Sequence, residues 1–173
     1  MADSARIAVV TVSDRVSRGE AEDRSGPAVR QCLEEGLVPG WHLEERLVAD
    51  ERQQIASLLV ELVDAVGCCL VVTTGGTGSG PRDVTPEATT EVCDRLLPGF
   101  GERMRAISVE SVPSAILSRQ VAGLRGTSLV VNLPGSPAGA RQCLEAVLPV
   151  IPHGIAVAGG SLLELASPPE LPH

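Results

Sequence analysis

The chain contains the stretch Cys68-Cys-Leu-Val-Val-Thr-Thr-Gly-Gly-Thr-Gly-Ser-Gly-Pro-Arg-Asp83. Its first part, Cys68 to Thr73, is a continuous apolar run, which is typical of a central parallel strand covered on both faces. A glycine-rich loop, Gly75–Pro81, follows directly. The sequence Thr85-Pro86-Glu87 then indicates the N-cap, N1 and N2 positions of a helix, because proline at N1 loses no needed hydrogen bond. The stretch therefore predicts one strand, loop and helix of a parallel α/β sheet.

The rest of the chain continues this alternation of strands and helices. Further strands are predicted at 6–12, 42–48, 120–124 and 128–132. Helices are predicted at 26–37, from 50 to about 66, from 85 to the Pro98-Gly99 pair, within 100–118 as two short helices, and from 138 to about 150, with a less regular segment at 152–165. Asp50 is expected to be an N-cap, and 13–25 is expected to be a loop.

This order of elements predicts a three-layer α/β/α fold with a mostly parallel central sheet. A tight Arg125-Gly126 turn joins the last two strands, so one strand must run antiparallel to the others. We expect a single domain over residues 1–166, followed by a frayed tail at 167–173.

The composition limits the classes of function. Of the 173 residues, 43% are hydrophobic and 21% are charged, which suits a globular domain. A formal net charge of −8 and an aromatic content of 1% argue against nucleic-acid binding, which needs basic surface or stacking side chains. The charge also disfavours anionic membranes; with no signal-like or spanning segment in the sequence, we expect a cytoplasmic protein. The five cysteines lack metal-ligand spacing and are expected to be buried thiols.

Polar or glycine-rich segments follow four of the predicted strands. They are Ser13-Asp14-Arg15, Ala49-Asp50, Thr74–Asp83 and Asn132–Ser136. In open α/β sheets, ligands bind beyond the carboxyl ends of the strands, so these segments are expected to converge on one site. The last of them, rich in proline and glycine, could form a wall of that site or only the turn that starts the next helix.

The central loop is suited to binding an anion. Glycines at 75, 76, 78 and 80 permit positive φ and leave main-chain N–H groups uncovered, so the loop can form an anion-binding nest. It is neither a Walker A loop nor a Rossmann fingerprint, because no Gly-Lys-Ser/Thr follows and Pro81 stands where the third glycine should be. A flexible connection between strand and helix is the alternative interpretation.

Charged side chains at the strand ends suggest how phosphates could bind. Asp50 and Asp83 could hold a divalent metal that is shared with substrate phosphates, and Asp14 could be a third ligand. Structural alternatives are an N-cap for Asp50 and, for Asp83, acceptance of main-chain N–H groups in its own turn. Arg82 and Arg15 are candidate phosphate contacts, with simple surface solvation as the alternative.

Six segments carry a resemblance to a known family. They are Val12–Arg15, Arg46–Asp50, Thr73–Ala88 (TTGGTGSGPRDVTPEA), Pro98–Glu102, Ala115–Val121 and Asn132–Pro137. Together they resemble the molybdopterin adenylyltransferase family, which includes domains of gephyrin, over about residues 6 to 155. The combination of TTGGTG with RDVTPEA is highly specific. The PGFGE and AILSRQV blocks are more similar to the stand-alone bacterial type than to its paralogues.

The resemblance implies a reaction in which AMP passes from ATP to the terminal phosphate of molybdopterin and pyrophosphate is released. It implies that Asp50 and Asp83 are catalytic and bind Mg²⁺. By motif it assigns ligand-binding roles to Thr74, Gly75, Gly76, Thr77, Gly78, Ser13, Asp14, Pro134, Gly135 and Ser136. It also implies a homotrimer and a downstream protein that inserts molybdate. The alternative is a molybdopterin-binding paralogue, or a scaffold module, without efficient adenylyl transfer.

Overall fold

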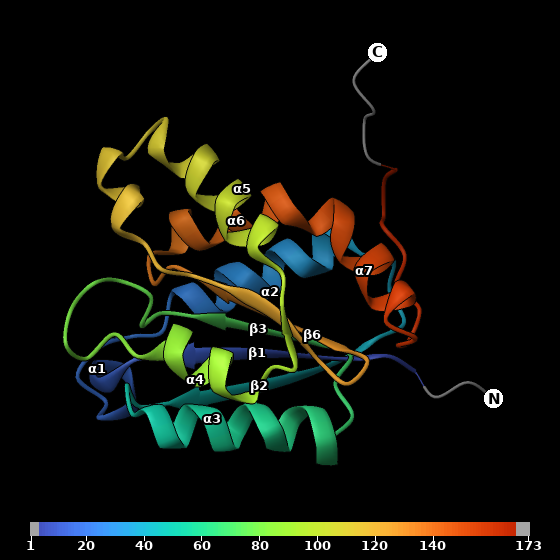
Figure 1. Ribbon diagram of the computed structural model, residues 1–173, viewed down its shortest axis with the longest axis horizontal. Coiled ribbons are helices and arrows are strands. Elements are labelled where there is room, and N and C mark those ends of the chain that lie inside the picture. The colour runs from blue at the N-terminus through green and yellow to red at the C-terminus, as the bar shows by residue number, and fades with distance from the viewer. Residues whose placement is uncertain (1–3, 169–173) are drawn as a thin grey trace.

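The computed structural model describes residues 4–168, which form a six-stranded sheet between two helical layers (Figure 1). Residues 1–3 and 169–173 lie outside the described residues, and with them most of the tail predicted at 167–173. The strands are β1 (Arg6–Val12), β2 (His42–Val48), β3 (Leu70–Thr74), β4 (Arg95–Leu96), β5 (Ala122–Arg125) and β6 (Ser128–Leu133). Their order across the sheet is β2-β1-β3-β6-β5-β4. The neighbouring strands β2, β1, β3 and β6 are parallel, and β5 is antiparallel to both of its neighbours, β6 and β4. The predicted mostly parallel sheet with one antiparallel strand is therefore confirmed.

Helices cover both faces of this sheet (Figure 1). They are α1 (Asp14–Ser17), α2 (Ser25–Gly36), α3 (Arg52–Val60) with its π-helical extension η1 (Glu61–Ala65), α4 (Thr85–Val92), α5 (Pro98–Val109), the 3-10 turns η2 (Pro113–Leu117) and η3 (Leu148–Val150), α6 (Pro137–Val147) and α7 (Ile151–Val157). Ile7 and Val9 of β1 pack with α2, α5, α6 and α7. Ala8 and Val10 pack on the opposite face with α3 and α4. Because alternate strand residues point to opposite faces, β1 lies at the centre of three layers, as predicted.

The sheet ends in a short strand that was not predicted. The sequence predicts one helix from Thr85 to Pro98, whereas α4 ends at Val92 and β4 follows. Main-chain N–H groups of Asp94 and Leu97 donate to carbonyls of β5 at 2.7 and 2.8 Å. These bonds satisfy the otherwise free edge of β5, so tertiary pairing overrides the local helix propensity. Pro98 does not end a helix but lies in the first turn of α5.

The segment between β1 and α2, predicted as a loop, contains the one-turn helix α1. Ser13 is its N-cap, and the Ser13 hydroxyl accepts a hydrogen bond from the main-chain N–H of Val16 at 3.2 Å. The main-chain N–H of Ser13 donates to the carbonyl of Val48, the last residue of β2, at 2.9 Å. The chain therefore remains at the carboxyl edge of the sheet, where the candidate site lies. No helix within residues 4–168 is long and apolar enough to cross a membrane.

Candidate active site

The glycine loop after β3 has a conformation that its first two glycines require. Gly75 and Gly76 have φ values of +106° and +66°, which side chains disfavour. A Cβ atom on Gly75 would lie 2.2 Å from the carbonyl oxygen of Val12. One on Gly76 would lie 2.3 Å from the Thr85 hydroxyl oxygen. The loop is thus packed closely against its surroundings at these two glycines.

Thr85 anchors the loop and does not cap α4. The sequence predicts Thr85 as the N-cap of α4, but the N-cap is Val84, which makes no side-chain hydrogen bond. The Thr85 hydroxyl instead donates to the carbonyl of Gly75 at 3.0 Å, and its main-chain N–H donates to the carbonyl of Gly76 at 3.1 Å. The start of α4 therefore holds the loop beside the end of β3.

Asp50 also differs from its predicted role as an N-cap. Glu51 occupies the cap position of α3, again without a side-chain hydrogen bond. The Asp50 carboxylate accepts from the main-chain N–H of Asp14 at 2.8 Å. The Asp14 carboxylate accepts in return from the main-chain N–H of Asp50 at 3.0 Å. The parallel pairing of β1 with β2 brings Asp14 and Asp50 together. Their two reciprocal hydrogen bonds form in place of a side-chain cap at the start of α3.

Asp83 makes the turn contact that was considered as its structural alternative. Its carboxylate accepts from the main-chain N–H of Gly80 at 2.9 Å. A Cβ atom on Gly78 would lie 2.8 Å from the same carboxylate oxygen, so glycine at 78 allows the side chain to fold over the loop. This contact does not exclude a functional role, because Asp83 also lines the cavity described next.

A cavity of about 370 Å³ opens at the carboxyl ends of the strands. Its lining residues are Thr11, Val12, Ser13, Val16, Glu22, Asp23, Arg24, Ser25, Asp50, Thr74, Gly75, Gly76, Asp83, Gly135 and Pro137. Asp50 and Asp83 thus share one cavity with the first glycines of the loop. Of the other predicted residues, Ser13, Thr74 and Gly135 are also part of this lining. The convergence of strand ends that the sequence predicts is confirmed at this cavity.

The remaining predicted residues lie around the cavity and not in its lining. Asp14 contacts it through Asp50. Arg82 donates to the Asp14 carboxylate at 3.0 and 3.1 Å and to Glu51 at 2.8 Å, so it is engaged by carboxylates at the surface. Thr77, a residue of the loop itself, is buried. The remaining candidates are Gly78, which packs against Asp83, and Pro134 and Ser136, which line a neighbouring cavity.

The site combines two carboxylates with opposite pKa shifts. Burial raises the pKa of Asp50, and the negative charges of Asp14 and Asp83 raise it further. A hydrogen bond from the Arg82 guanidinium lowers the pKa of Asp14, with a further lowering contribution from the main-chain N–H of Asp50. Asp14 is therefore neutralised within the protein, whereas the charge of Asp50 is left for a ligand to compensate.

The donor set at the cavity suits a hard cation that is shared with a substrate. Asp50 and Asp83 offer carboxylate oxygens, and neither histidine nor cysteine lines this cavity. Within residues 4–168 there is no group of three or more His, Cys, Asp or Glu side chains that could hold a metal alone. Mg²⁺ commonly takes one or two protein carboxylates together with substrate phosphates, and these residues fit that pattern.

A second cavity, of about 170 Å³, adjoins the first and has a different character. Its lining residues are Arg105, Ser108, Val112, Ser114, Ala115, Ser118, Gln120, Pro134, Ser136, Gly139 and Gln142. Gln120 is 1% exposed, and its Oε1 has no hydrogen-bond partner in the described structure. The Oγ of Ser118 is also buried and has no partner there. Ser136 accepts from the main-chain N–H of Gly139 as the N-cap of α6, so the turn starts that helix, while Gly135 of the same segment also lines the larger cavity.

Arg119 is a residue of the site that the predicted set omitted. Its guanidinium donates to the carbonyl of Gly78 at 2.8 Å and to that of Asp83 at 2.7 Å, and it pairs with Glu87. Arg119 belongs to the Ala115–Val121 segment that carries the family resemblance. That membership was a signal of importance, but no local pattern indicated that its side chain reaches the glycine loop.

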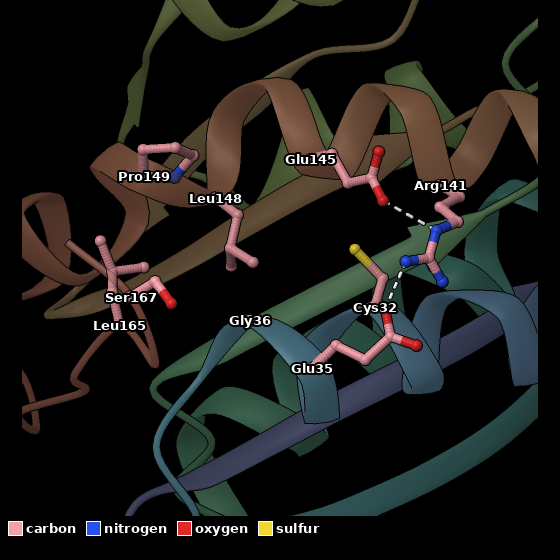
Figure 2. Close-up of a pocket in the computed structure, with 9 residues that line it drawn as sticks. All are labelled: Cys32, Glu35, Gly36, Arg141, Glu145, Leu148, Pro149, Leu165 and Ser167. Carbon is pink, nitrogen blue, oxygen red and sulfur yellow. Dashed lines mark hydrogen bonds and ion pairs between the residues drawn. The ribbon is translucent and has the colours of Figure 1, made fainter. Parts of the chain in front are cut away.

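A third cavity, of about 210 Å³, lies between α2 and α6 and contains no predicted site residue (Figure 2). Arg141 spans it by pairing with Glu35 and Glu145. Cys32 points into it, and burial raises the pKa of this thiol to about 11, so it is a poor nucleophile. This cavity lies at the C-terminal end of α2, whereas the N-terminal Ser25 lines the site. All five cysteines are free thiols, and four are buried, as predicted, while Cys93 is partly exposed.

The mostly parallel sheet, the glycine loop and the two carboxylates define an α/β protein with a candidate ligand-binding site at its strand ends. Residues 8–153 match the family described as "Probable molybdopterin binding domain". The chain belongs to this family, as the sequence predicts.

Individual relatives agree with this assignment. The chain is 50% identical over 159 residues to the molybdopterin adenylyltransferase of Helicobacter pylori, which covers 92% of this chain and 90% of that protein. It is 38% identical over 157 residues to gephyrin of Dictyostelium discoideum, which covers 86% of this chain and 22% of that protein. The crystal structure of the molybdopterin biosynthesis enzyme MoaB from Thermus thermophilus aligns with a TM-score of 0.83 and 46% identity, covering 91% of this chain and 98% of that one.

Proposed function

We propose that the protein is a molybdopterin adenylyltransferase of molybdenum-cofactor synthesis. The observation that carries the proposal is that Asp50 and Asp83 line the same cavity as the closely packed glycines 75 and 76. Nucleotidyl transfer needs positioning and charge neutralisation more than covalent help from the protein. A glycine loop with two carboxylates supplies both, and the relative from Helicobacter pylori is named for this activity.

In this reaction an oxygen of the terminal phosphate of molybdopterin attacks the α-phosphorus of ATP. The bond between the α-phosphorus and the bridging oxygen breaks, and pyrophosphate leaves with the electron pair. Main-chain N–H groups of residues 76–79 bind and orient phosphate oxygens, whereas those of Gly75 and Gly80 donate to Leu133 and Asp83. Asp50 and Asp83 hold Mg²⁺, which when bound neutralises phosphate charge. No nucleophilic cysteine or general-base histidine is needed.

The two adjoining cavities suit two parts of the ligands. The larger one, beside the glycine loop and the carboxylates, suits the phosphates. The smaller one offers two buried oxygens, Ser118 Oγ and Gln120 Oε1, which have no hydrogen-bond partner among residues 4–168. Because unpaired buried acceptors are costly, a flat heterocycle with N–H donors, such as the pterin, fits this cavity.

The competing hypothesis is a binding or scaffold module. The partly buried position of Asp50 argues against it, because partial burial and two neighbouring carboxylates make the charged form of Asp50 less favourable without a cation. A module that only binds pterin has no use for that arrangement. Retention of both Asp50 and Asp83 on one cavity favours catalysis.

The assembly and its surroundings form part of the same proposal. The resemblance implies a homotrimer and a downstream protein that receives the adenylated product, and the sequence predicts a cytoplasmic location. Exposed apolar side chains support an interface: Ile116 is 72% and Leu117 is 60% exposed, on the short turn η2. Apolar surface of this kind commonly marks contacts between proteins.

Incubation of the purified protein with molybdopterin and MgATP tests the proposal. We expect pyrophosphate and an AMP-linked pterin in equal amounts, and neither product when molybdopterin or divalent metal is omitted. Tight molybdopterin binding without either product would instead support the binding module and overturn the assigned activity.

A further inference from the structure

Arg119 connects three acceptors from two different elements. Its Nε donates to the carbonyl of Gly78 at 2.8 Å, and its Nη2 donates to the carbonyl of Asp83 at 2.7 Å. Its Nη1 pairs with the carboxylate of Glu87, in the first turn of α4. The planar guanidinium therefore fixes two points of the glycine loop relative to the following helix.

These contacts bear on the carboxylate of Asp83. One clamped carbonyl belongs to Asp83 itself, and the other belongs to Gly78, against which the Asp83 carboxylate packs. The only hydrogen bond to the carboxylate itself among the described residues comes from the main-chain N–H of Gly80, inside the same loop. Arg119 holds the main chain of this turn directly, whereas the exposed side chain of Arg82 links the turn to Asp14 and Glu51 at the surface. Movement of the loop between 78 and 83 would carry the carboxylate with it.

Arg119 also lies between the two cavities. Its chain neighbours Ser118 and Gln120 line the smaller cavity, while its side chain holds the loop whose residues line the larger one. The main-chain N–H of Arg119 donates to the carbonyl of Thr77 at 2.8 Å, which joins the same two segments. Residues 118–120 thus link the wall of the smaller cavity to the loop that lines the larger one.

We propose that Arg119 is a positioning residue, which sets the Asp83 carboxylate for reaction and links its position to the wall of the smaller cavity. This inference rests on the proposed adenylyl transfer. Arg119 does not line the larger cavity, so it acts through the loop and not by contact with the phosphates. Its loss is therefore expected to lower kcat much more than it raises the KM for ATP.

Arg125 offers a matched control. Its guanidinium also clamps a main-chain carbonyl, that of Val92 at 2.9 Å, and pairs with a carboxylate, that of Asp64 at 3.0 Å. Arg125 lines neither cavity. Arg119→Gln and Arg125→Gln therefore remove similar sets of bonds, but only the first releases the glycine loop.

Two measurements on the full chain test the inference. Hydrogen exchange without substrates reports on amides of 76–85, where we expect about tenfold faster exchange in Arg119→Gln and no change in Arg125→Gln. Steady-state adenylylation should show kcat lowered about 100-fold in Arg119→Gln, with the KM for ATP changed less than about threefold. Arg119→Lys keeps the positive charge but lacks the planar guanidinium with its several N–H donors. Its kcat should be about tenfold higher than that of Arg119→Gln.

Unchanged exchange in the 76–85 amides of Arg119→Gln would overturn the inference, whatever the activity. A kcat within about threefold of wild type would do so too, since the position of Asp83 would then not matter. A loss of melting temperature equal to that of Arg125→Gln, with no additional loss of kcat, would indicate a purely structural role and overturn it as well. Absence of transfer by the wild-type protein would refute the proposed function, while the exchange experiment would still decide whether Arg119 holds the loop.

Discussion

Asp14 and Asp50 each accept a hydrogen bond from the other's main-chain N–H, at 2.8 and 3.0 Å. The exchange joins the chain just after β1 to the chain just after β2, where these parallel strands end side by side. It uses one oxygen of Asp50 and leaves Oδ1 facing Gly76, since a Cβ atom there would lie 3.0 Å from it. The position of the Asp50 carboxylate at the cavity is therefore determined by Asp14.

Asp14→Ala is predicted to lower adenylylation about tenfold, because Asp50 loses an acceptor for its N–H and becomes less well positioned. It should also lower the free energy of unfolding by about 1 kcal/mol through the lost hydrogen bond. Rate measurements and urea denaturation check both. Glu51→Gln, which removes only the other carboxylate partner of Arg82, is the control and should react at the wild-type rate. Equal losses in the two variants would show that the Arg82 ion pairs, and not the Asp14–Asp50 exchange, matter.

Asp50→Asn is predicted to abolish most activity and yet to raise stability at neutral pH. Burial raises the pKa of Asp50 above its ordinary value of 3.8, so the folded chain binds this proton more strongly than the unfolded chain. Stability therefore falls as pH rises from 3.8 through the raised pKa. Asparagine removes that penalty but keeps an oxygen to accept from Asp14.

Thermal unfolding of the wild type and Asp50→Asn at two pH values measures this effect. Near pH 7 we expect the melting temperature of the variant to be higher by about 2 °C, or less than ~1 kcal/mol, since Asp50 is only partly buried. Near pH 3.5 the difference should become much smaller, because the wild-type carboxyl is then mostly protonated in both states. A variant that is less stable at neutral pH would contradict a raised pKa as the dominant effect.

Much of this architecture could be predicted, because its causes are local. The buried run before Gly75 indicated a central strand, and the spacing of Ile55, Leu59 and Leu62 indicated a helix with one buried face, as found. The loop glycines were recognised as permitting positive φ, which Gly75 and Gly76 adopt. These features depend on residues that are close together in the sequence.

The features that were missed depend on distant partners. The cap assigned to Asp50 was reasonable locally, but its actual partner, Asp14, lies 36 residues earlier in the chain. Similarly, Arg119 reaches the carbonyl of Gly78 across 41 residues. No periodicity or motif spacing encodes such pairings, which arise only when the strands have been placed in order.

Gly76→Ala is predicted to destabilise the protein more than an alanine at an equally left-handed but open position. At Gly76, with φ of +66°, the new methyl group would also meet the Thr85 hydroxyl and the Asp50 carboxylate. We expect a loss of about 3 kcal/mol and little remaining activity. Gly67→Ala, with φ of +80° and no atom within 4 Å of the added carbon, should cost only about 1 kcal/mol.

Chemical denaturation of both alanine variants separates backbone strain from crowding of the added methyl group. Both sites have a positive φ, but only Gly76 has atoms close to the added carbon. The excess loss at Gly76 measures how closely the loop packs against Thr85 and Asp50. Equal losses would mean that the loop moves aside freely, which contradicts its role as a rigid phosphate-binding element.

Asp83→Asn is predicted to keep the fold and molybdopterin affinity but to lower the rate of adenylyl transfer at least ~100-fold, on the order of 3 kcal/mol in the activation barrier. The asparagine oxygen can still accept from the main-chain N–H of Gly80, as the carboxylate does at 2.9 Å, so the loop should keep its shape. What is lost is the negative charge that faces the same cavity as Asp50. Single-turnover rates, compared with molybdopterin binding measured by titration, separate these effects. A variant that transfers AMP at the wild-type rate would remove the catalytic role of Asp83, and one that no longer binds molybdopterin would show that the side chain contributes to ligand affinity instead.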